Sequence, residues 1–130
     1  MILLLDGTSD SRDLACELMA SGYSIIATAI TSDGVKKLED KNIRAIQGKM
    51  DYKALVSKCR ELSIDVIIDG THPYADSMHE NAIKASKEAE KTRDFPISKS
   101  AVAWTTRVIM LDLSELSSPI VSFMKLKLCL

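Results

Sequence analysis

Two histidines, a proline and several acids stand close together in the stretch DGTHPYADSMHENA at positions 69–82. Pro73 has a fixed φ and keeps the residue before it extended, so Thr71 and His72 are expected on a stiffened loop. An imidazole there could hydrogen-bond an acidic ligand or transfer a proton near neutral pH. The alternative is that His72 is structural and that Pro73 only starts the next helix.

His79 lies seven positions after His72, which raises the question of a metal site. Zinc sites combine closely spaced His, Cys or carboxylate ligands. The three cysteines, Cys16, Cys59 and Cys129, lie far apart and form no CxxC pair. We therefore expect no metal ion, and thiols that stay reduced.

A second loop, DGTSDS at positions 6–11, follows an apolar run and precedes a helical pattern. Gly7 allows a close backbone approach, while Thr8 and Ser9 offer hydroxyls and amides at the positive end of a helix. That combination favours a phosphate site. A single glycine is not the three-glycine dinucleotide pattern, and the alternative is that Ser9 or Asp10 only caps the helix.

The end of the second apolar run bears on the choice of cofactor. NAD sites usually place an acid there, because it binds the ribose hydroxyls and repels a 2′-phosphate. Here the run ends in TAITS, with hydroxyls at Thr31 and Ser32 and cations at Lys36 and Lys37. If a dinucleotide binds, NADPH is favoured, although Asp33 argues against it. The alternative is a solvated helix start with surface lysines.

Short apolar runs alternate with helical patterns over the first ninety residues. Strands are expected over 2–5, 23–30, 43–47 and 64–69. Helices are expected between the first two strands up to Gly22, over 32–41, from Asp51 to Leu62, and from Ala75 to Glu90. This order predicts an α/β, Rossmann-like fold with a parallel sheet and flanking helices. Both loops then lie beyond the carboxyl ends of strands, where ligands of such sheets bind.

The pattern changes after Thr92. Segments 97–104 and 107–113 could each form a strand, but no clean period remains. We expect a nucleotide-binding domain over residues 1–92 and an atypical, irregular tail over 93–130. Our hypothesis is that the tail is truncated or translated out of frame, which sequencing of the coding DNA would test.

The totals exclude several classes of protein. Lys and Arg number 17 and Asp and Glu 18 among 130 residues, and aromatic residues are few, so no nucleic-acid partner is expected. The opening MILLL has no basic flank and stops at Asp6, which is too short for export or for a membrane span. A cytoplasmic protein without a membrane partner is expected.

The strings ILLLDGTSDSRDLACEL and IDVIIDGTHPYADSMHENAIKAS resemble precorrin-6A reductase, including its cobalt-precorrin-6A form. That family has a Gly-Gly-Thr-Ser/Thr turn after its first strand. It also has Asp-Ala-Thr-His-Pro-Phe/Tyr-Ala after a central strand, followed by a Ser-x-Asn-Ala helix. The resemblance ends near residue 90. The matching positions are Gly7, Thr8, Ser9, Asp69, Thr71, His72, Pro73, Tyr74, Ala75, Asn81 and Ala82.

Three positions within the matched region depart from the family pattern. Asp6 replaces the first glycine of the turn and adds a carboxylate beside the expected phosphate site. Gly70 stands where alanine is usual, and His79 stands where serine is usual. The family's Gly-Ile-Pro-Tyr-Ile-Arg strand, its Arg-Pro element and its second α/β domain have no counterpart after residue 92.

The resemblance implies an oxidoreductase of cobalamin biosynthesis that transfers hydride from NADPH to a CH–CH group of a tetrapyrrole, precorrin-6A or cobalt-precorrin-6A. It assigns cofactor phosphates to Gly7, Thr8 and Ser9, and substrate or nicotinamide to Thr71, His72, Pro73 and Tyr74. His72 is the candidate proton donor. Thr31, Ser32 and Lys36 are the expected contacts of the 2′-phosphate.

The resemblance covers only the N-terminal half of such an enzyme, so little activity is expected of this chain alone. A non-catalytic nucleotide-binding fragment is the alternative function. A homodimer through the apolar segment IVSFMKLKLCL at 120–130 could cover the site.

Overall fold

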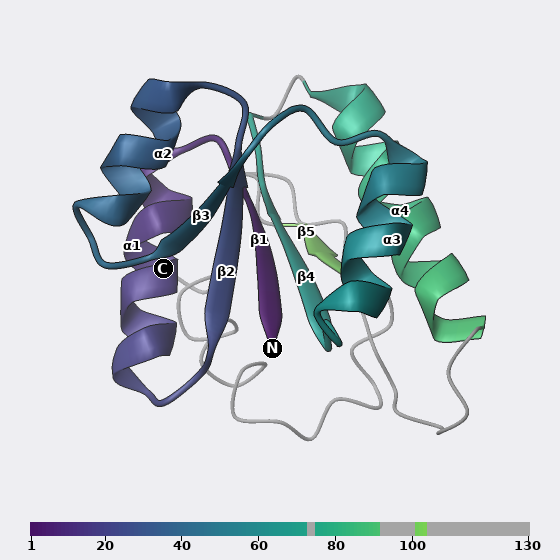
Figure 1. The fold of residues 1–130 in the computed structure, drawn as a ribbon, viewed down its shortest axis with the longest axis horizontal. Helices are drawn as coiled ribbons and strands as arrows, with labels where there is room; N and C mark the ends of the chain where they lie inside the picture. The colour runs from purple at the N-terminus through teal and green to yellow at the C-terminus, as the bar shows by residue number, and fades with distance from the viewer. Residues whose placement is uncertain (73–74, 92–100, 104–130) are drawn as a thin grey trace.

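The computed structural model describes residues 1–72, 75–91 and 101–103 and contains one parallel sheet with helices on both faces (Figure 1). The strands are β1 (Ile2–Asp6), β2 (Ile25–Ala29), β3 (Arg44–Gln47), β4 (Val66–Gly70) and β5 (Ala101–Ala103). The helices are α1 (Ser9–Ala20), α2 (Ser32–Glu39), α3 (Tyr52–Glu61) and α4 (Asp76–Lys91).

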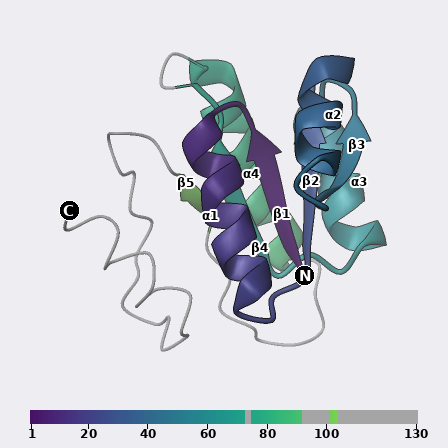
Figure 2. The same ribbon diagram turned by 90° about the vertical axis from the view of Figure 1, so that its left-hand side faces the viewer.

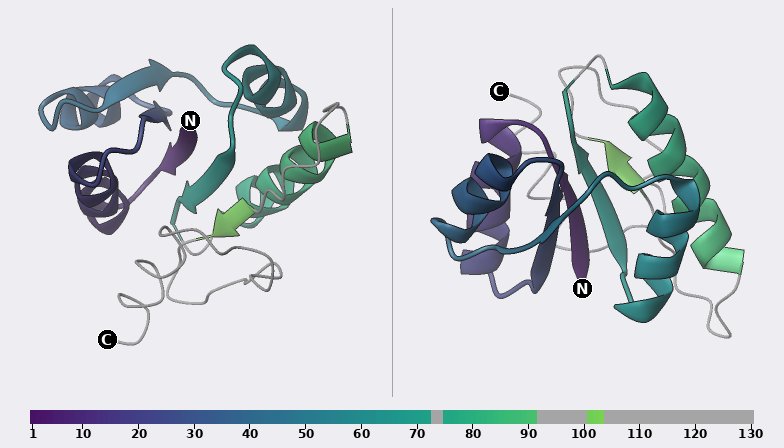
Figure 3. Two further views of the ribbon diagram at one scale, coloured as in Figure 1. Left: turned by 90° about the horizontal axis from the view of Figure 1, so that it is seen from below. Right: turned by 45° about the horizontal axis from the view of Figure 1, so that its top comes forward.

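The strand order is β3-β2-β1-β4-β5, so β1 lies in the middle between β2 and β4. Helices α1 and α2 cover one face of the sheet, and α3 and α4 cover the other (Figures 1 and 2). The chain changes faces after β3, as the view from below in Figure 3 shows. The direction in which strands are added therefore reverses between β1 and β4, the place where open α/β sheets bind ligands.

The apolar run of β1 is buried on both faces because both faces carry helices. Ile2 and Leu4 belong to the core beneath α1 and α2, whereas Leu3 and Leu5 belong to the core beneath α3 and α4. Successive side chains of a strand point to opposite faces, so one short run supplies two cores. The continuous apolar pattern at residues 2–5 is explained by this placement.

The helix ends are set by local chemistry that is partly visible in the sequence. Gly22 follows α1 with φ of 91°, and Asp51 caps α3 by accepting a hydrogen bond from the Ala54 amide at 2.8 Å; both were predicted. Asn42 and Ser63 take the same left-handed conformation after α2 and α3, with φ of 59° and 51°. The sequence did not predict the conformation of these two residues, because glycine is the residue type that clearly indicates it.

The expected α/β, Rossmann-like fold is confirmed, with shifts of a residue or two at the element ends. The strand expected over 23–30 begins at Ile25 because the Tyr23 amide bonds back to the Leu18 carbonyl and closes α1. Strand β5 lies inside the segment 97–104 that could form a strand. The alternative strand at 107–113 lies outside the described residues, and the domain division at residue 92 stays a prediction.

Three further expectations concern the cysteines, the membrane and a metal site. Cys16 and Cys59 are free thiols, as expected, while Cys129 lies outside the described residues. Among the helices that the structure describes, none has both the length and the apolar composition to cross a bilayer. The described residues also contain no group of three or more His, Cys, Asp or Glu side chains placed to hold a metal ion.

The core packing around β1 predicts the outcome of a simple truncation. Leu3 is fully buried, so Leu3→Ala is expected to lower the free energy of unfolding by about 2–5 kcal/mol through lost burial and a residual cavity. Ile30 is 62% exposed, so Ile30→Ala should cost less than about 0.5 kcal/mol. Urea unfolding followed by circular dichroism measures both, and equal losses would contradict this description of the core.

Candidate functional site

The turn after β1 and the loop after β4 touch each other at the carboxyl edge of the sheet, where Asp6 pairs in register with Gly70. A Cβ placed on Gly7 would lie 2.7 Å from the Thr71 Cα, closer than real structures allow. The Thr8 hydroxyl donates to the Gly70 carbonyl at 3.2 Å. The structure thus brings the two sequence-predicted loops together, and Gly7 permits contact between them.

Gly70 makes room for a side chain from α1. A Cβ at position 70 would lie 2.3 Å from the Ser11 Cβ, so an alanine there would force Ser11 or the strand to move. Ser11 is fully buried, and its hydroxyl lies 2.8 Å from the Thr8 carbonyl oxygen and 3.0 Å from the Asp6 carboxylate. Glycine at position 70, where the resemblance leads one to expect alanine, is therefore matched to the buried serine opposite it.

Asp6 is the second member of this arrangement. Its side chain is 3% exposed, and its carboxylate accepts a hydrogen bond from the Arg12 guanidinium at 2.8 Å. The Arg12 side chain is itself only 16% exposed. Asp6 does bring a carboxylate to this edge, as expected from the sequence. The sequence did not predict that this carboxylate pairs with the Arg12 cation.

The hydroxyl of Thr8 makes two hydrogen bonds within the fold. It accepts a hydrogen bond from the Ser11 amide at 3.2 Å and caps α1, while it donates to Gly70. The alternative that Ser9 or Asp10 caps the helix is therefore wrong. Ser9 is exposed in the first turn of α1, where backbone amides have no partner within the helix.

A buried carboxylate organises the second loop. Asp69 is 1% exposed and accepts hydrogen bonds from the Thr71 amide at 3.1 Å and the Thr71 hydroxyl at 2.6 Å. The other carboxylate oxygen contacts Nδ1 of His79, whose side chain is 11% exposed. Nε2 of His79 is buried and has no hydrogen-bond partner within the part of the chain that the structure describes.

His79, for which the sequence predicts no functional role, ties the end of β4 to α4. The signal that could have indicated this contact is the position of His79 in the sequence, next to the apolar stripe of that helix and ten residues after the acid that ends the strand. Thr71 is half-buried and His72 is exposed, and the His72 carbonyl accepts from the Ala75 amide at 2.9 Å as α4 begins. Pro73 and Tyr74 lie outside the described residues.

A pocket of about 260 Å³ opens beside these loops, at the carboxyl ends of β1 and β2. Of the residues expected to contact a 2′-phosphate, Thr31 lines it, but its hydroxyl accepts a hydrogen bond from the Gly34 amide and caps α2. Ser32 and Lys36 do not line it. The lining residues are Asp6, Gly7, Arg12, Ala29, Ile30, Thr31, Asp33, Gly34 and Lys37.

Two charged side chains of α2 meet at the rim of this pocket. The Lys37 ammonium lies 2.6 Å from the Asp33 carboxylate, and both groups are more than half exposed. The hydrogen bond and the charge of Lys37 hold the pKa of Asp33 below its usual value. The charges of Lys36 and Arg12 add to this lowering, so Asp33 stands in a positive field.

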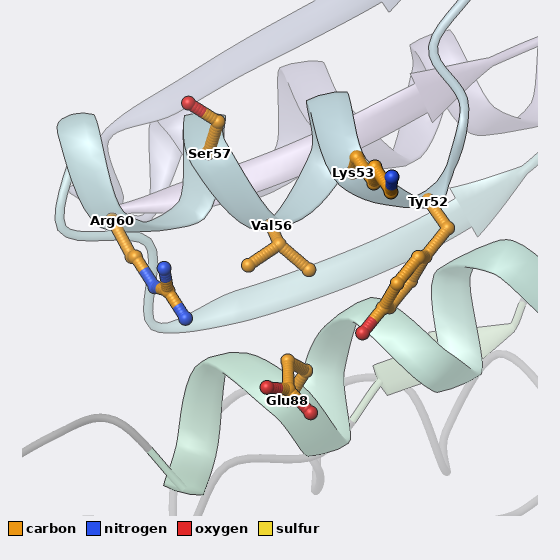
Figure 4. Close-up of a pocket in the computed structure, with 6 residues that line it drawn as sticks. All are labelled: Tyr52, Lys53, Val56, Ser57, Arg60 and Glu88. Carbon is orange, nitrogen blue, oxygen red and sulfur yellow. The ribbon is translucent and has the colours of Figure 1, made fainter.

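A larger hollow of about 370 Å³ lies between α3 and α4 (Figure 4). None of its lining residues comes from the strand ends that carry the motifs, so it is separate from the site described above. The lining residues are Tyr52, Lys53, Val56, Ser57, Arg60 and Glu88.

The family model of precorrin-6x reductase CbiJ/CobK matches residues 1–93 of the chain. The chain belongs to this family. The match includes both loops, the pocket between β1 and β2, and the buried Asp69–His79 pair. The resemblance inferred from the two motif strings is therefore confirmed, with the same C-terminal limit.

Curated members of the family include the cobalt-precorrin-6A reductases of Priestia megaterium and Methanocaldococcus jannaschii. The first is 34% identical over 88 residues, covering 68% of this chain and 34% of that protein. The second is 33% identical over 88 residues, covering 67% of this chain and 35% of that protein. The chain thus spans about a third of the length of the curated relatives that it matches.

A solved structure described as CobK precorrin-6A reductase has the same fold over this region. Its TM-score is 0.59 at 22% sequence identity, and the match covers 82% of this chain and 41% of that one. At this identity the likeness supports only the architecture of the sheet and helices.

The contact between His79 and Asp69 predicts a difference between two substitutions. His79→Leu would leave a buried carboxylate oxygen without its partner and should lower the free energy of unfolding by about 1–3 kcal/mol. His79→Asn keeps a donor near the Nδ1 position and should lose less. Urea denaturation compares the two, and equal destabilisation would show that the hydrogen bond contributes nothing beyond packing.

Proposed function

We propose that this chain forms the cofactor-binding part of an NADPH-dependent reductase of precorrin-6A or cobalt-precorrin-6A in cobalamin biosynthesis. The observation that carries the proposal is the contact of the Gly7 turn with the Thr71–His72 loop at the switch point of a CbiJ/CobK-family sheet. Its curated relatives carry the name cobalt-precorrin-6A reductase.

The residues at this edge fit a phosphorylated dinucleotide. The first turn of α1 presents its amides beside Gly7, which suits a pyrophosphate. Arg12 and Lys37 bring cations to the adjoining pocket, and Ile30 brings an exposed apolar side chain that suits a base. NADPH, when bound, supplies the hydride of the reaction.

The roles expected from sequence change in detail within this proposal. Gly7 and Ser9 remain phosphate contacts, Ser9 through its exposed first-turn position. Thr8 acts by holding the turn in shape, because its hydroxyl is already bonded to Ser11 and Gly70. Lys37 takes the place proposed for Lys36, since it lines the pocket.

The second loop is proposed to face the tetrapyrrole or the nicotinamide. Asp69 fixes Thr71 through two hydrogen bonds, so the exposed His72 is held at the ligand edge of the sheet. We assign His72 as the proton donor or as a contact of an acidic substrate. Pro73 and Tyr74 complete the proposed loop, and the proposed homodimer through residues 120–130 concerns a segment outside the described residues.

The cofactor assignment is tested by binding alone. We expect NADPH to bind the purified chain more tightly than NADH, because Arg12 and Lys37 bring two cations to the pocket. Titration of each nucleotide, followed by its own fluorescence or by calorimetry, gives the two dissociation constants. Equal constants, or a preference for NADH, would contradict the assignment.

The 130 residues alone are expected to turn over little or no precorrin-6A even where they bind NADPH. Hydride transfer needs both reactants held in near-attack geometry with water excluded. A single parallel sheet offers its strand-end loops to an open crevice, so a large polyanionic macrocycle meets one wall. Monitoring NADPH oxidation with substrate present checks this expectation. Ordinary enzyme rates from a monomer would refute it.

A further inference from the structure

Resting on the proposed function, we propose that Arg12 and Lys37 select between phosphorylated and unphosphorylated dinucleotides, and that Asp33 limits this selectivity by competing for Lys37. The sequence expectation had placed Lys36 in this role. The inference comes from the walls of the 260 Å³ pocket at the ends of β1 and β2.

The two lysines of α2 are neighbours in sequence but not in space. Consecutive helical residues are rotated by about 100°, so their side chains leave the helix in different directions. Lys37 lines the pocket together with Asp33 and Gly34 of the preceding turn, and Lys36 does not. A phosphate in the pocket therefore meets the ammonium of Lys37.

Arg12 reaches the same pocket from α1 and is held there. Its Nη1 donates to the buried Asp6 carboxylate at 2.8 Å, which uses one of the five N–H groups of the guanidinium. A fixed, planar fork is suited to a phosphate, whereas a free arginine would lose side-chain entropy on binding. Asp6, the carboxylate that the sequence places beside the expected phosphate site, orients this cation.

Asp33 weakens the preference for the phosphorylated dinucleotide. Its carboxylate lies 2.6 Å from the Lys37 ammonium. A 2′-phosphate that binds Lys37 must therefore break this ion pair, and the Asp33 carboxylate is then left next to a second anion. With the unphosphorylated cofactor, the same carboxylate can accept hydrogen bonds from the ribose hydroxyls. The lowered pKa of Asp33 means that this carboxylate is ionised at neutral pH.

The test measures dissociation constants of NADPH and NADH for the full chain and for matched variants. Lys37→Gln should lower the NADPH-to-NADH affinity ratio roughly 3- to 10-fold, the scale of one partly screened charge contact. Lys36→Gln, the control one residue away, should leave the ratio within about twofold. Asp33→Asn should raise the ratio by strengthening NADPH binding.

Arg12→Lys tests the second cation while keeping its charge. The ratio should fall because the planar fork is lost, and circular dichroism with urea unfolding separates this effect from loss of the fold. If the variant does not fold, Arg12→Gln takes its place: loss of the cation should lower the NADPH-to-NADH affinity ratio, and an unchanged ratio would overturn the role of Arg12.

The outcomes distinguish the two proposals. If the wild-type chain binds neither nucleotide, the proposed function fails and the selectivity proposal fails with it. If both nucleotides bind and Lys36→Gln, not Lys37→Gln, changes the ratio, only the assignment of residues is overturned. A ratio unaffected by Asp33→Asn would overturn the competing role of that carboxylate.

Discussion

The backbone contact between the turn after β1 and the loop after β4 is the constraint on which the rest of this site depends. The parallel register places Asp6 beside Gly70, and neither Gly7 nor Gly70 has room for a Cβ. Because the two strands are neighbours at the centre of the sheet, separating their ends would disturb both cores. The contact occupies the space between the strand ends, and the pocket accordingly opens toward β2.

Two buried carboxylates make this contact specific. Burying a carboxylate is costly unless hydrogen bonds or a counter-charge compensate for lost water. Asp6 meets this condition through Ser11 and Arg12 of α1, and Asp69 meets it through the Thr71 turn and His79 of α4. Each acid therefore ties a central strand to a helix, and the two helices lie on opposite faces of the sheet (Figure 1).

Much of this could be predicted from local patterns, and the remainder depends on tertiary contacts. Apolar runs and helical periods reveal the elements because each period reflects which faces are buried. The pairing of Asp6 with Arg12 and of Asp69 with His79 could not be derived in that way, since it depends on how loops and helices meet. The choice between Lys36 and Lys37 likewise needs the position of the neighbouring strand end.

Two of the three departures from the pattern that the resemblance gives, Asp6 and Gly70, form one coupled set when they are placed in space. Gly70 leaves the room that Ser11 fills, and Ser11 together with Arg12 satisfies Asp6. Considered singly, the replacement of glycine by aspartate looks harmful to a phosphate site. In the folded chain it fixes a guanidinium at the pocket, where a rigid, largely buried cation can position an anion. The exposed Lys37–Asp33 pair is screened by water and exchanges partners at little cost, so it is better suited to discriminate than to position.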